Sequence, residues 1–207
     1  MVTLSAGRMI SLGCDPNRLA SRGSSCEAAR VGEYVRHVRS RLSSSDLAEM
    51  QHVDQLAESL RGHLTSRAEF IAALHIYGAQ SKAIQNEVGS LLEDQLGFGS
   101  EIVLKPQDGL VTQSRPDFYF DLGDGRGVIA EVERGGTTAN NHDLKDLWKA
   151  HIAINAQHLF LVVPTALINK GGRVRERPFQ KVVRRMGAFF GDARREIDVV
   201  SVHIFGY

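Results

Sequence analysis

The sequence contains only two cysteines among its 207 residues, which excludes the disulfide framework that holds many small secreted domains together. Cys14 and Cys26 form no CxxC pair, and no set of cysteines and histidines at zinc-finger spacing accompanies them. We expect a chance pair of reduced thiols in a cytoplasmic protein; a disulfide between them is the alternative.

Long apolar runs are missing as well. No stretch is long enough to span a bilayer, and the opening sequence MVTLSAGRMISLGCDPNRLASRG lacks the continuous apolar segment of a secretory signal. Several enzyme signatures are also absent: a GxxxxGK[ST] phosphate loop, a GxGxxG turn that opens a helix, a GxSxG nucleophile turn and an HExxH zinc motif. These absences predict a protein that neither enters a membrane nor uses a nucleotide cofactor.

The composition is that of a soluble globular protein with one core, since 43% of the residues are hydrophobic and 24% are charged. Residues 1–26 are rich in glycine, serine and arginine without a sustained period, and we expect a loosely ordered arm there. Apolar side chains recur at helical spacing over 27–42, 43–64 and 66–78. Residues 27–78 are therefore predicted to form a helical extension.

The rest of the chain, residues 79–207, alternates between helical and strand-like patterns. Helices are predicted at 81–98, 140–155 and 179–191, and strands at 101–106, 116–122, 127–133, 158–164 and 198–207. Because a helix separates the strands at 127–133 and 158–164, we expect these two strands to be parallel and joined by a crossover. The sequence predicts a mixed α/β core.

The segment RPDFYFDLGDGRGVIAEVERGG, residues 115–136, predicts a hairpin with acids on its strands. Asp117 and Asp121 share one face of the first strand, and Glu131 and Glu133 share one face of the second. Asp117 lies on the same face as both glutamates only if the two residue numbers of each cross-strand pair have an even sum. A tight two-residue turn gives an odd sum, so we expect an odd-length loop or a β-bulge. Asp121 lies nearer the turn and is interpreted as structural.

Three carboxylates on one face repel one another and raise one another's pKa values unless a cation joins them. Hard oxygen ligands favour Mg²⁺, with Mn²⁺ as a substitute. The alternative is a solvated sheet face whose acids pair with Arg115, Arg126 and Arg134.

The hairpin resembles the PD-(D/E)xK motif of a nuclease superfamily that includes many type II restriction endonucleases and repair nucleases. Pro116-Asp117 is followed by thirteen residues, Glu131, one residue and Glu133, and the order of elements over residues 81–165 is also similar. The resemblance implies a restriction-endonuclease-like mixed sheet flanked by helices, here with an N-terminal helical extension. It implies metal ligation by Asp117 and Glu131. Glu133 stands where the family usually has lysine, and we include it as a further candidate ligand.

Three more residues are candidates for the site. Lys145 and Lys149 lie one turn apart on the predicted helix 140–155 and are candidates for the missing lysine, with solvated helix charges as the alternative. Glu87 lies at the edge of the apolar face of its helix and is a candidate fourth acid, with a surface acid as the alternative. Gln85 and Glu93 are expected to turn away.

A basic segment contrasts with the total charge of +1. Residues 170–195 carry nine lysines and arginines against two acids, a local charge of +7. Such a charge fits phosphate binding or a merely solubilising role, and the acid cluster described above favours phosphate binding. Candidate nucleic-acid contacts are Lys170, Arg173, Arg175 and Arg177 in this segment, together with Arg134, Asn140 and Asn141 in and after the acidic motif. Asn140 and Asn141 have a helix cap and turn as their alternative role, and Trp148 is expected in the core.

These patterns favour a Mg²⁺-dependent endonuclease that hydrolyses double-stranded DNA as a cytoplasmic, restriction-endonuclease-like enzyme. A palindromic target would require a twofold homodimer, with residues 27–78 as the dimer arm. Two alternatives stay open. One is a repair, recombination or phage-defence nuclease that reads DNA structure or modification, and the other is a catalytically inactive DNA-binding module of the same fold.

Overall fold

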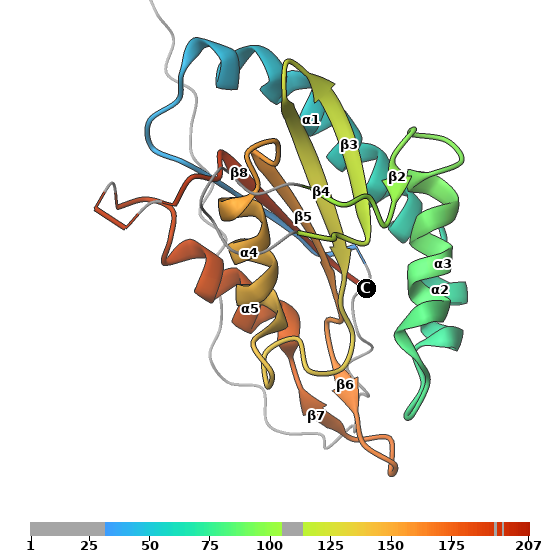
Figure 1. The fold of residues 1–207 in the computed structure, drawn as a ribbon. Coiled ribbons are helices and arrows are strands. Elements are labelled where there is room, and N and C mark those ends of the chain that lie inside the picture. The colour runs from blue at the N-terminus through green and yellow to red at the C-terminus, as the bar shows by residue number, and fades with distance from the viewer. Residues whose placement is uncertain (1–31, 105–113, 193, 196) are drawn as a thin grey trace, which may run out of the picture.

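The chain builds a mixed six-stranded β-sheet with helices on both faces (Figure 1). The structure, a computed structural model, describes residues 32–104, 114–192, 194–195 and 197–207, so the arm expected at residues 1–26 lies outside the described residues. The elements in chain order are β1 (Tyr34–Val38), α1 (Ser44–Ser66), α2 (Ala68–Leu74), α3 (Ser81–Leu92), β2 (Gly99–Ser100), β3 (Phe118–Gly123), β4 (Arg126–Val132), α4 (His142–Ile152), β5 (His158–Val163), β6 (Leu167–Ile168), β7 (Val174–Glu176), α5 (Pro178–Gly187) and β8 (Ser201–Gly206).

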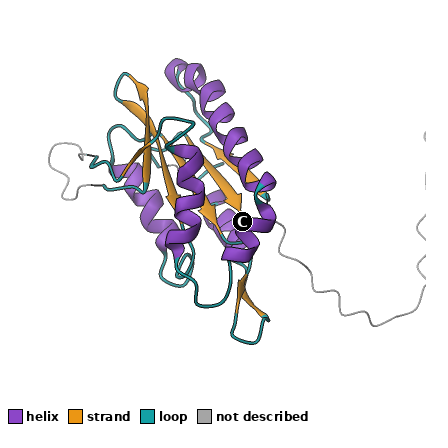
Figure 2. Ribbon diagram, turned by 90° about the vertical axis from the view of Figure 1, so that its right-hand side faces the viewer, coloured by secondary structure: helices purple, strands orange, loops and turns teal. Residues whose placement is uncertain are grey.

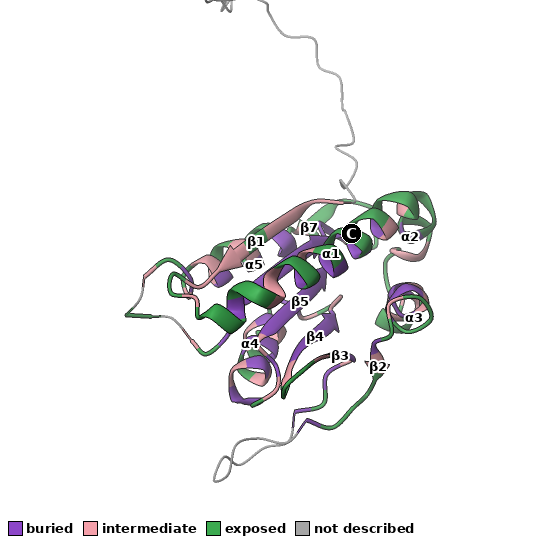
Figure 3. Ribbon diagram, turned by 90° about the horizontal axis from the view of Figure 1, so that it is seen from above, coloured by how far each residue is buried: buried purple, intermediate pink, exposed green. Residues whose placement is uncertain are grey.

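The sheet has the strand order β1-β8-β5-β4-β3-β2. Its three central strands, β8, β5 and β4, are parallel, which confirms the crossover expected through α4. The outer strands β1, β3 and β2 are antiparallel to their neighbours. The central strands are almost wholly buried, as expected for strands covered on both faces (Figure 3).

Two hydrophobic clusters lie on opposite faces of the sheet. The first joins apolar side chains of α1, α2 and α3 to Val128, Ala130 and Val132 of β4. The second joins α4 and α5 to Ile129 of β4 and to alternate residues of β5 and β8. Because side chains alternate along a strand, Glu131 faces the α4 and α5 side of the sheet.

The N-terminal part of the chain differs from the expected helical extension. Residues Tyr34–Val38 form an edge strand that pairs with β8, so the helix expected over 27–42 is wrong where the structure describes it. β-Branched and aromatic residues favour a strand once a sheet edge is within reach. The apolar face of α1 packs on the sheet through Val53, Leu56 and Leu60, so α1 is a layer of the core.

Polar contacts fix α1 to the sheet. Ser43 and Asp46 form the capping box at its start. Arg126 of β4 donates to Asp46 at 2.5 Å and also pairs with Glu49. His158 of β5 contacts Glu49 at 2.8 Å. Although burial raises the pKa of Glu49, the bonds from Arg126 and His158 bring it down to about 2.

The strand expected at 101–106 is displaced. β2 is limited to Gly99–Ser100, and Leu104 makes an isolated bridge to Ser114. In the described parts of the chain, no helix combines the length and the apolar character needed to cross a membrane.

Candidate active site

The β3–β4 hairpin contains the β-bulge that the arrangement of the acids requires. Its tip is a tight turn in which Asp124 and Gly125 both have positive φ, and the pairing shifts by one residue between Asp121 and Gly123. Beyond the bulge Phe118 pairs with Ala130, so the two residue numbers have the even sum that puts Asp117 on the face of Glu131. Asp121 accepts a hydrogen bond from the backbone of Gly123 at 2.8 Å, which agrees with its predicted structural role.

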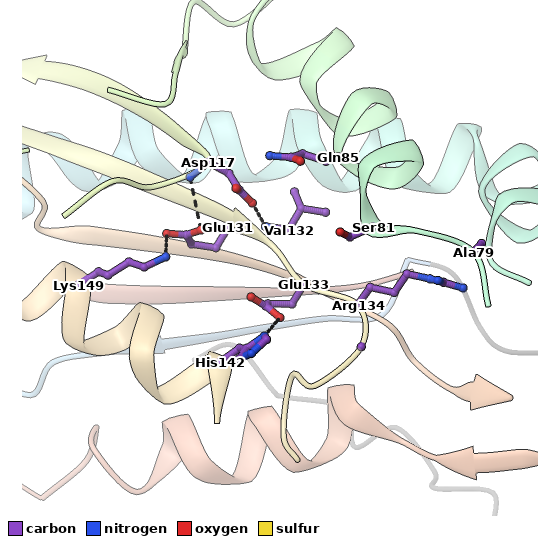
Figure 4. Close-up of a pocket in the computed structure, with 11 residues that line it drawn as sticks. Ala79, Ser81, Gln85, Asp117, Glu131, Val132, Glu133, Arg134, His142 and Lys149 are labelled. Atoms are coloured by element: carbon purple, nitrogen blue, oxygen red, sulfur yellow. Dashed lines mark hydrogen bonds and ion pairs between the residues drawn. The ribbon is translucent and has the colours of Figure 1, made fainter. Parts of the chain in front are cut away.

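This register brings Asp117 and Glu131 together at the end of the two strands (Figure 4). The backbone N–H of Asp117 points to Glu131 Oε2 at 3.4 Å, and the backbone N–H of Val132 donates to Asp117 Oδ2 at 2.9 Å. Glu131 is only 3% exposed. The acids thus lie in a buried corner rather than on a solvated sheet face.

Lys149 reaches the same corner from α4. Its Nζ lies 2.8 Å from Glu131 Oε1 and 2.9 Å from Asp146 Oδ1. Asp146 was not predicted as a site residue, although its position three residues before Lys149 on one helix face was a usable signal. It is 2% exposed, and its Oδ2 has no hydrogen-bond partner among the described residues.

Two buried acids, Glu131 and Asp146, therefore share the ammonium group of Lys149. Burial and the neighbouring Asp146 raise the pKa of Glu131 to about 8, in spite of Lys149. Burial likewise raises the pKa of Asp146 to about 7. Burial lowers the pKa of Lys149, but its two carboxylates outweigh that effect and the net direction is upward. Near neutral pH, Lys149 is protonated and the two acids hold about one proton between them.

The same influences act on Asp117. Burial raises its pKa, while the N–H of Val132 and the charge of Lys149 oppose that rise. A divalent cation would reverse the pattern by favouring the ionised form of each carboxylate.

A second acid–base pair lines the same site. His142, at the start of α4, places Nδ1 2.9 Å from Glu133 Oε2. Since a carboxylate accepts the hydrogen bond, Nδ1 carries the proton and Nε2 is left to exchange one. His142 was not predicted as a site residue; its position at the start of the helix that follows the motif was the only available signal.

These groups surround a cavity of about 380 Å³ (Figure 4). Its lining includes Asp117, Glu131, Glu133, His142 and Lys149. The cavity lies where β4 ends, the edge of a parallel sheet at which ligands commonly bind.

The oxygen groups suit a hard divalent cation. Among the described residues, no group of three or more His, Cys, Asp or Glu side chains converges on one metal position. Mg²⁺, however, commonly takes only one or two carboxylates and completes its shell with water and phosphate oxygens. Asp117 and Glu131 supply two carboxylates to one cavity, and the unpartnered Oδ2 of Asp146 lies on the neighbouring helix.

Two of the predicted site residues lie elsewhere. Glu87 pairs with Arg67 at 2.6 Å and with His63 at 3.3 Å, on the side of α3 that faces α1 and α2. Gln85 was expected to turn away but lines the cavity instead, because α3 is rotated relative to its predicted orientation. Lys145 is exposed and contributes nothing to the cavity lining, so Lys149 alone of the two lysines meets the acids.

The alternative explanation of the acids, pairing with three arginines, is wrong. Arg115 pairs with Glu101, Arg126 binds Asp46 and Glu49, and Arg134 donates to the backbone of Ile76.

The basic segment is divided in the structure. Arg185 pairs with Asp143, Lys181 with Glu176, and Arg194 with Asp192, so these charges are partly neutralised. The first part of the segment forms the tip and the second strand of the β6–β7 hairpin, which projects from the body of the protein (Figures 1 and 2). Exposed residues on or beside it are Lys170, Arg173, Arg175 and Arg177.

The predicted contacts after the motif take mixed positions. Asn140 and Asn141 are exposed, and Asn141 is the first residue before α4, where its side chain accepts from Arg185 at 3.2 Å. Trp148 is 58% exposed, which corrects its predicted place in the core. It packs beside His151 on the outer side of α4.

Comparisons of the chain with protein-family models, with curated proteins and with solved structures found no match.

Proposed function

We propose that the protein is a Mg²⁺-dependent nuclease that hydrolyses phosphodiester bonds of DNA. The observation that carries the proposal is the meeting of Asp117, Glu131 and Lys149 in one open cavity at the end of the β3–β4 hairpin. The resemblance to the PD-(D/E)xK motif supports the same chemistry. In this protein the lysine would come from α4, since Glu133, directly after β4, occupies the position where the motif usually has lysine.

The metal would be held by Asp117 and Glu131. When bound, it supplies Lewis-acid stabilisation for the negative charge that develops on the scissile phosphate.

Lys149 serves as a fixed positive charge. Its raised pKa keeps the ammonium protonated throughout the neutral range, so it is unsuited to accept a proton from water. Its hydrogen bonds to Glu131 and Asp146 instead hold the ammonium at the cavity, where it can donate to a phosphate oxygen.

Proton transfer is assigned to His142. Glu133 fixes the orientation of the imidazole, and the free Nε2 can exchange a proton with water or with the leaving oxygen. We expect His142→Gln to reduce the rate of cleavage about 100-fold or more, the usual range for a lost acid–base group. The measurement is single-turnover cleavage between pH 5.5 and 9.

The pH profile distinguishes the assigned role from a structural one. A catalytic His142 gives a wild-type profile with a limb that disappears in the His142→Gln variant. His151→Gln, on the same helix but outside the cavity lining, is the matched control and should retain the wild-type profile. An unchanged profile in His142→Gln would contradict the assignment.

The decisive test of the function is nicking of supercoiled plasmid with Mg²⁺ or Mn²⁺. We expect Asp117→Asn to abolish nicking, because the variant removes a charged metal ligand while preserving side-chain size. Asp121→Asn is the matched control, since Asp121 lies on the same strand face but is exposed and outside the cavity. Loss of nicking only in Asp117→Asn supports the proposal; absence of nicking by the wild type with either metal refutes it.

A catalytically inactive DNA-binding module is the second candidate. The observation that favours it is the ion pairing of Lys149 with both Glu131 and Asp146, which neutralises carboxylates without any metal. Wild-type protein that binds DNA in a gel-shift assay but leaves plasmid intact would establish this alternative.

The DNA is expected to lie along the cavity and against the β6–β7 hairpin. Exposed cations there match the phosphate backbone, and binding should weaken steeply with added salt. Restriction-like cleavage would produce defined fragments from phage DNA, whereas a structure-reading enzyme would cut only altered DNA.

A further inference from the structure

A second cavity adjoins the candidate active site. It has a volume of about 210 Å³ and lies between the loop that joins α2 to α3 and the base of the β6–β7 hairpin. Arg134 and Gly135 line both cavities, so a ligand in one can continue into the other. The second cavity is smaller than the roughly 300–1,000 Å³ typical of drug-sized ligands, and its size suits one planar group.

The walls of this cavity combine aromatic, apolar and cationic groups. Ile76 and Tyr77, two consecutive large side chains, are 57% and 56% exposed. Apolar surface exposed in this way often marks a binding site. Leu167 and Ile168 line the cavity from the β6–β7 hairpin, and Arg175 adds a guanidinium. Aromatic rings and guanidinium planes are the groups on which unpaired bases stack.

Two buried polar atoms in the walls have no hydrogen-bond partner among the described residues. They are Nε of Arg134 and Nδ1 of His75. Because Nε2 of His75 donates to the carbonyl of Ala166 at 2.7 Å, Nδ1 of the neutral ring is an acceptor. The two residues that carry an unsatisfied donor and an unsatisfied acceptor thus both line this cavity, and the edge of a nucleobase offers both complementary groups.

Both residues are held in place by contacts within the protein. Arg134 also donates to the carbonyl of Ile76, which fixes the loop that carries Tyr77. The ring of His75 packs edge-on against Tyr207. The cavity is therefore built before any ligand arrives, and the unpaired atoms are not the result of a loosely placed surface side chain.

We infer that this cavity binds one unstacked nucleotide beside the scissile phosphate, so that the substrate is DNA with an unpaired base next to the cut. The inference rests on the proposed nuclease function, because that function places the scissile phosphate in the first cavity. A base must leave the duplex to enter, and this is easiest when the base is already unpaired. Among the alternatives left open above, the inference favours an enzyme that reads DNA structure.

The test uses three duplexes that differ at one position: fully paired DNA, DNA with one unpaired 2-aminopurine, and DNA with an abasic residue there. Binding is measured by anisotropy in EDTA, which needs no cleavage, and stacking is measured by quenching of 2-aminopurine fluorescence. We expect wild-type protein to bind the unpaired duplex about tenfold more tightly than the paired or abasic duplex.

Substitutions at Tyr77 connect the preference to the cavity. Tyr77→Ala should lose both the quenching and the preference, whereas Tyr77→Phe should retain them because the ring remains. Trp148→Ala removes an equally exposed aromatic residue on α4 and should bind as the wild type does. Equal wild-type affinity for the three duplexes, or full quenching by Tyr77→Ala, would overturn the inference.

The outcomes separate this inference from the nuclease proposal. If the protein binds unpaired DNA preferentially through Tyr77 but cuts nothing with Mg²⁺ or Mn²⁺, the nucleotide site stands and the nuclease proposal fails. If it cuts all three duplexes equally and Tyr77→Ala has no effect, the nuclease proposal stands and the nucleotide site fails.

Discussion

Replacing Lys149 with methionine is expected to destabilise the protein strongly at pH 8 and only slightly at pH 5. The substitution preserves much of the side-chain volume but leaves Glu131 and Asp146 buried without their shared cation. Breaking a buried ion pair in this way typically costs about 3–5 kcal/mol. At pH 5 both acids are protonated in the folded protein, so little of that cost remains.

The direction of the pH effect follows from proton linkage. The pKa values of Glu131 and Asp146, about 8 and about 7, lie above their ordinary values, so the folded protein binds protons that the unfolded chain has released. Stability is therefore present at low pH and is lost as the pH rises through the folded pKa values. Removal of Lys149 makes this loss steeper, because nothing then favours the ionised acids.

Denaturant unfolding at pH 5, 6.5 and 8 measures the effect. Lys145→Met is the matched control, since Lys145 is exposed one turn earlier on the same helix, and it should unfold as the wild type does. Mg²⁺ should raise the melting temperature of Lys149→Met more than that of the wild type, because a cation can replace the lost charge. Wild-type stability of Lys149→Met at pH 8 would contradict the assigned ion pairs.

The second large effect is expected from Glu131→Gln, which should stabilise the fold at pH 9 while abolishing cleavage. Glutamine is nearly isosteric with protonated glutamate and never ionises. In the wild type, stability is lost as the pH rises towards the raised pKa of Glu131, about 8, because the folded protein holds a proton that the unfolded chain has released. The variant avoids that loss and leaves Lys149 paired one to one with Asp146.

Thermal unfolding at pH 5 and pH 9 measures the expected gain in stability, and plasmid nicking measures the expected loss of activity. The melting temperatures of variant and wild type should agree at pH 5 and diverge at pH 9, with the variant higher. Glu93→Gln, an exposed acid at the end of α3, should match the wild type at both pH values. A lower melting temperature for Glu131→Gln at pH 9 would show that ionised Glu131 stabilises the fold.

The hairpin was predictable because its information is local. Alternation along two short strands fixed which acids share a face, and the need for an even register predicted an odd-length loop or a bulge, of which the structure has the bulge. The same holds for the order of the longer helices and strands after residue 80, where the period of the apolar residues changes at each boundary, whereas the short strands β6 and β7 were not predicted.

The missed elements depend on distant partners. Tyr34 of β1 pairs with Phe205 of β8. A local sequence pattern does not predict a strand that forms only against a neighbour so far along the chain. The orientation of α3 could not be predicted either, since Glu87 and Gln85 both flank its apolar face. Only the packing of α3 against α1 and α2 decides which of the two lines the cavity. His142 and Asp146 join the site through the way α4 packs on the sheet.

The bulge in β3 imposes a rule on changes at the far end of the hairpin. Asp117 faces Glu131 only because one residue between Asp121 and Gly123 is unpaired, which offsets the two-residue tip. If the tip kept its two residues and the unpaired residue were deleted, the pairing beyond it would slip by one and Asp117 would be sent into the layer of α1 and α3. The chemistry at one end of the hairpin is thus tied to a single unpaired residue near the other end.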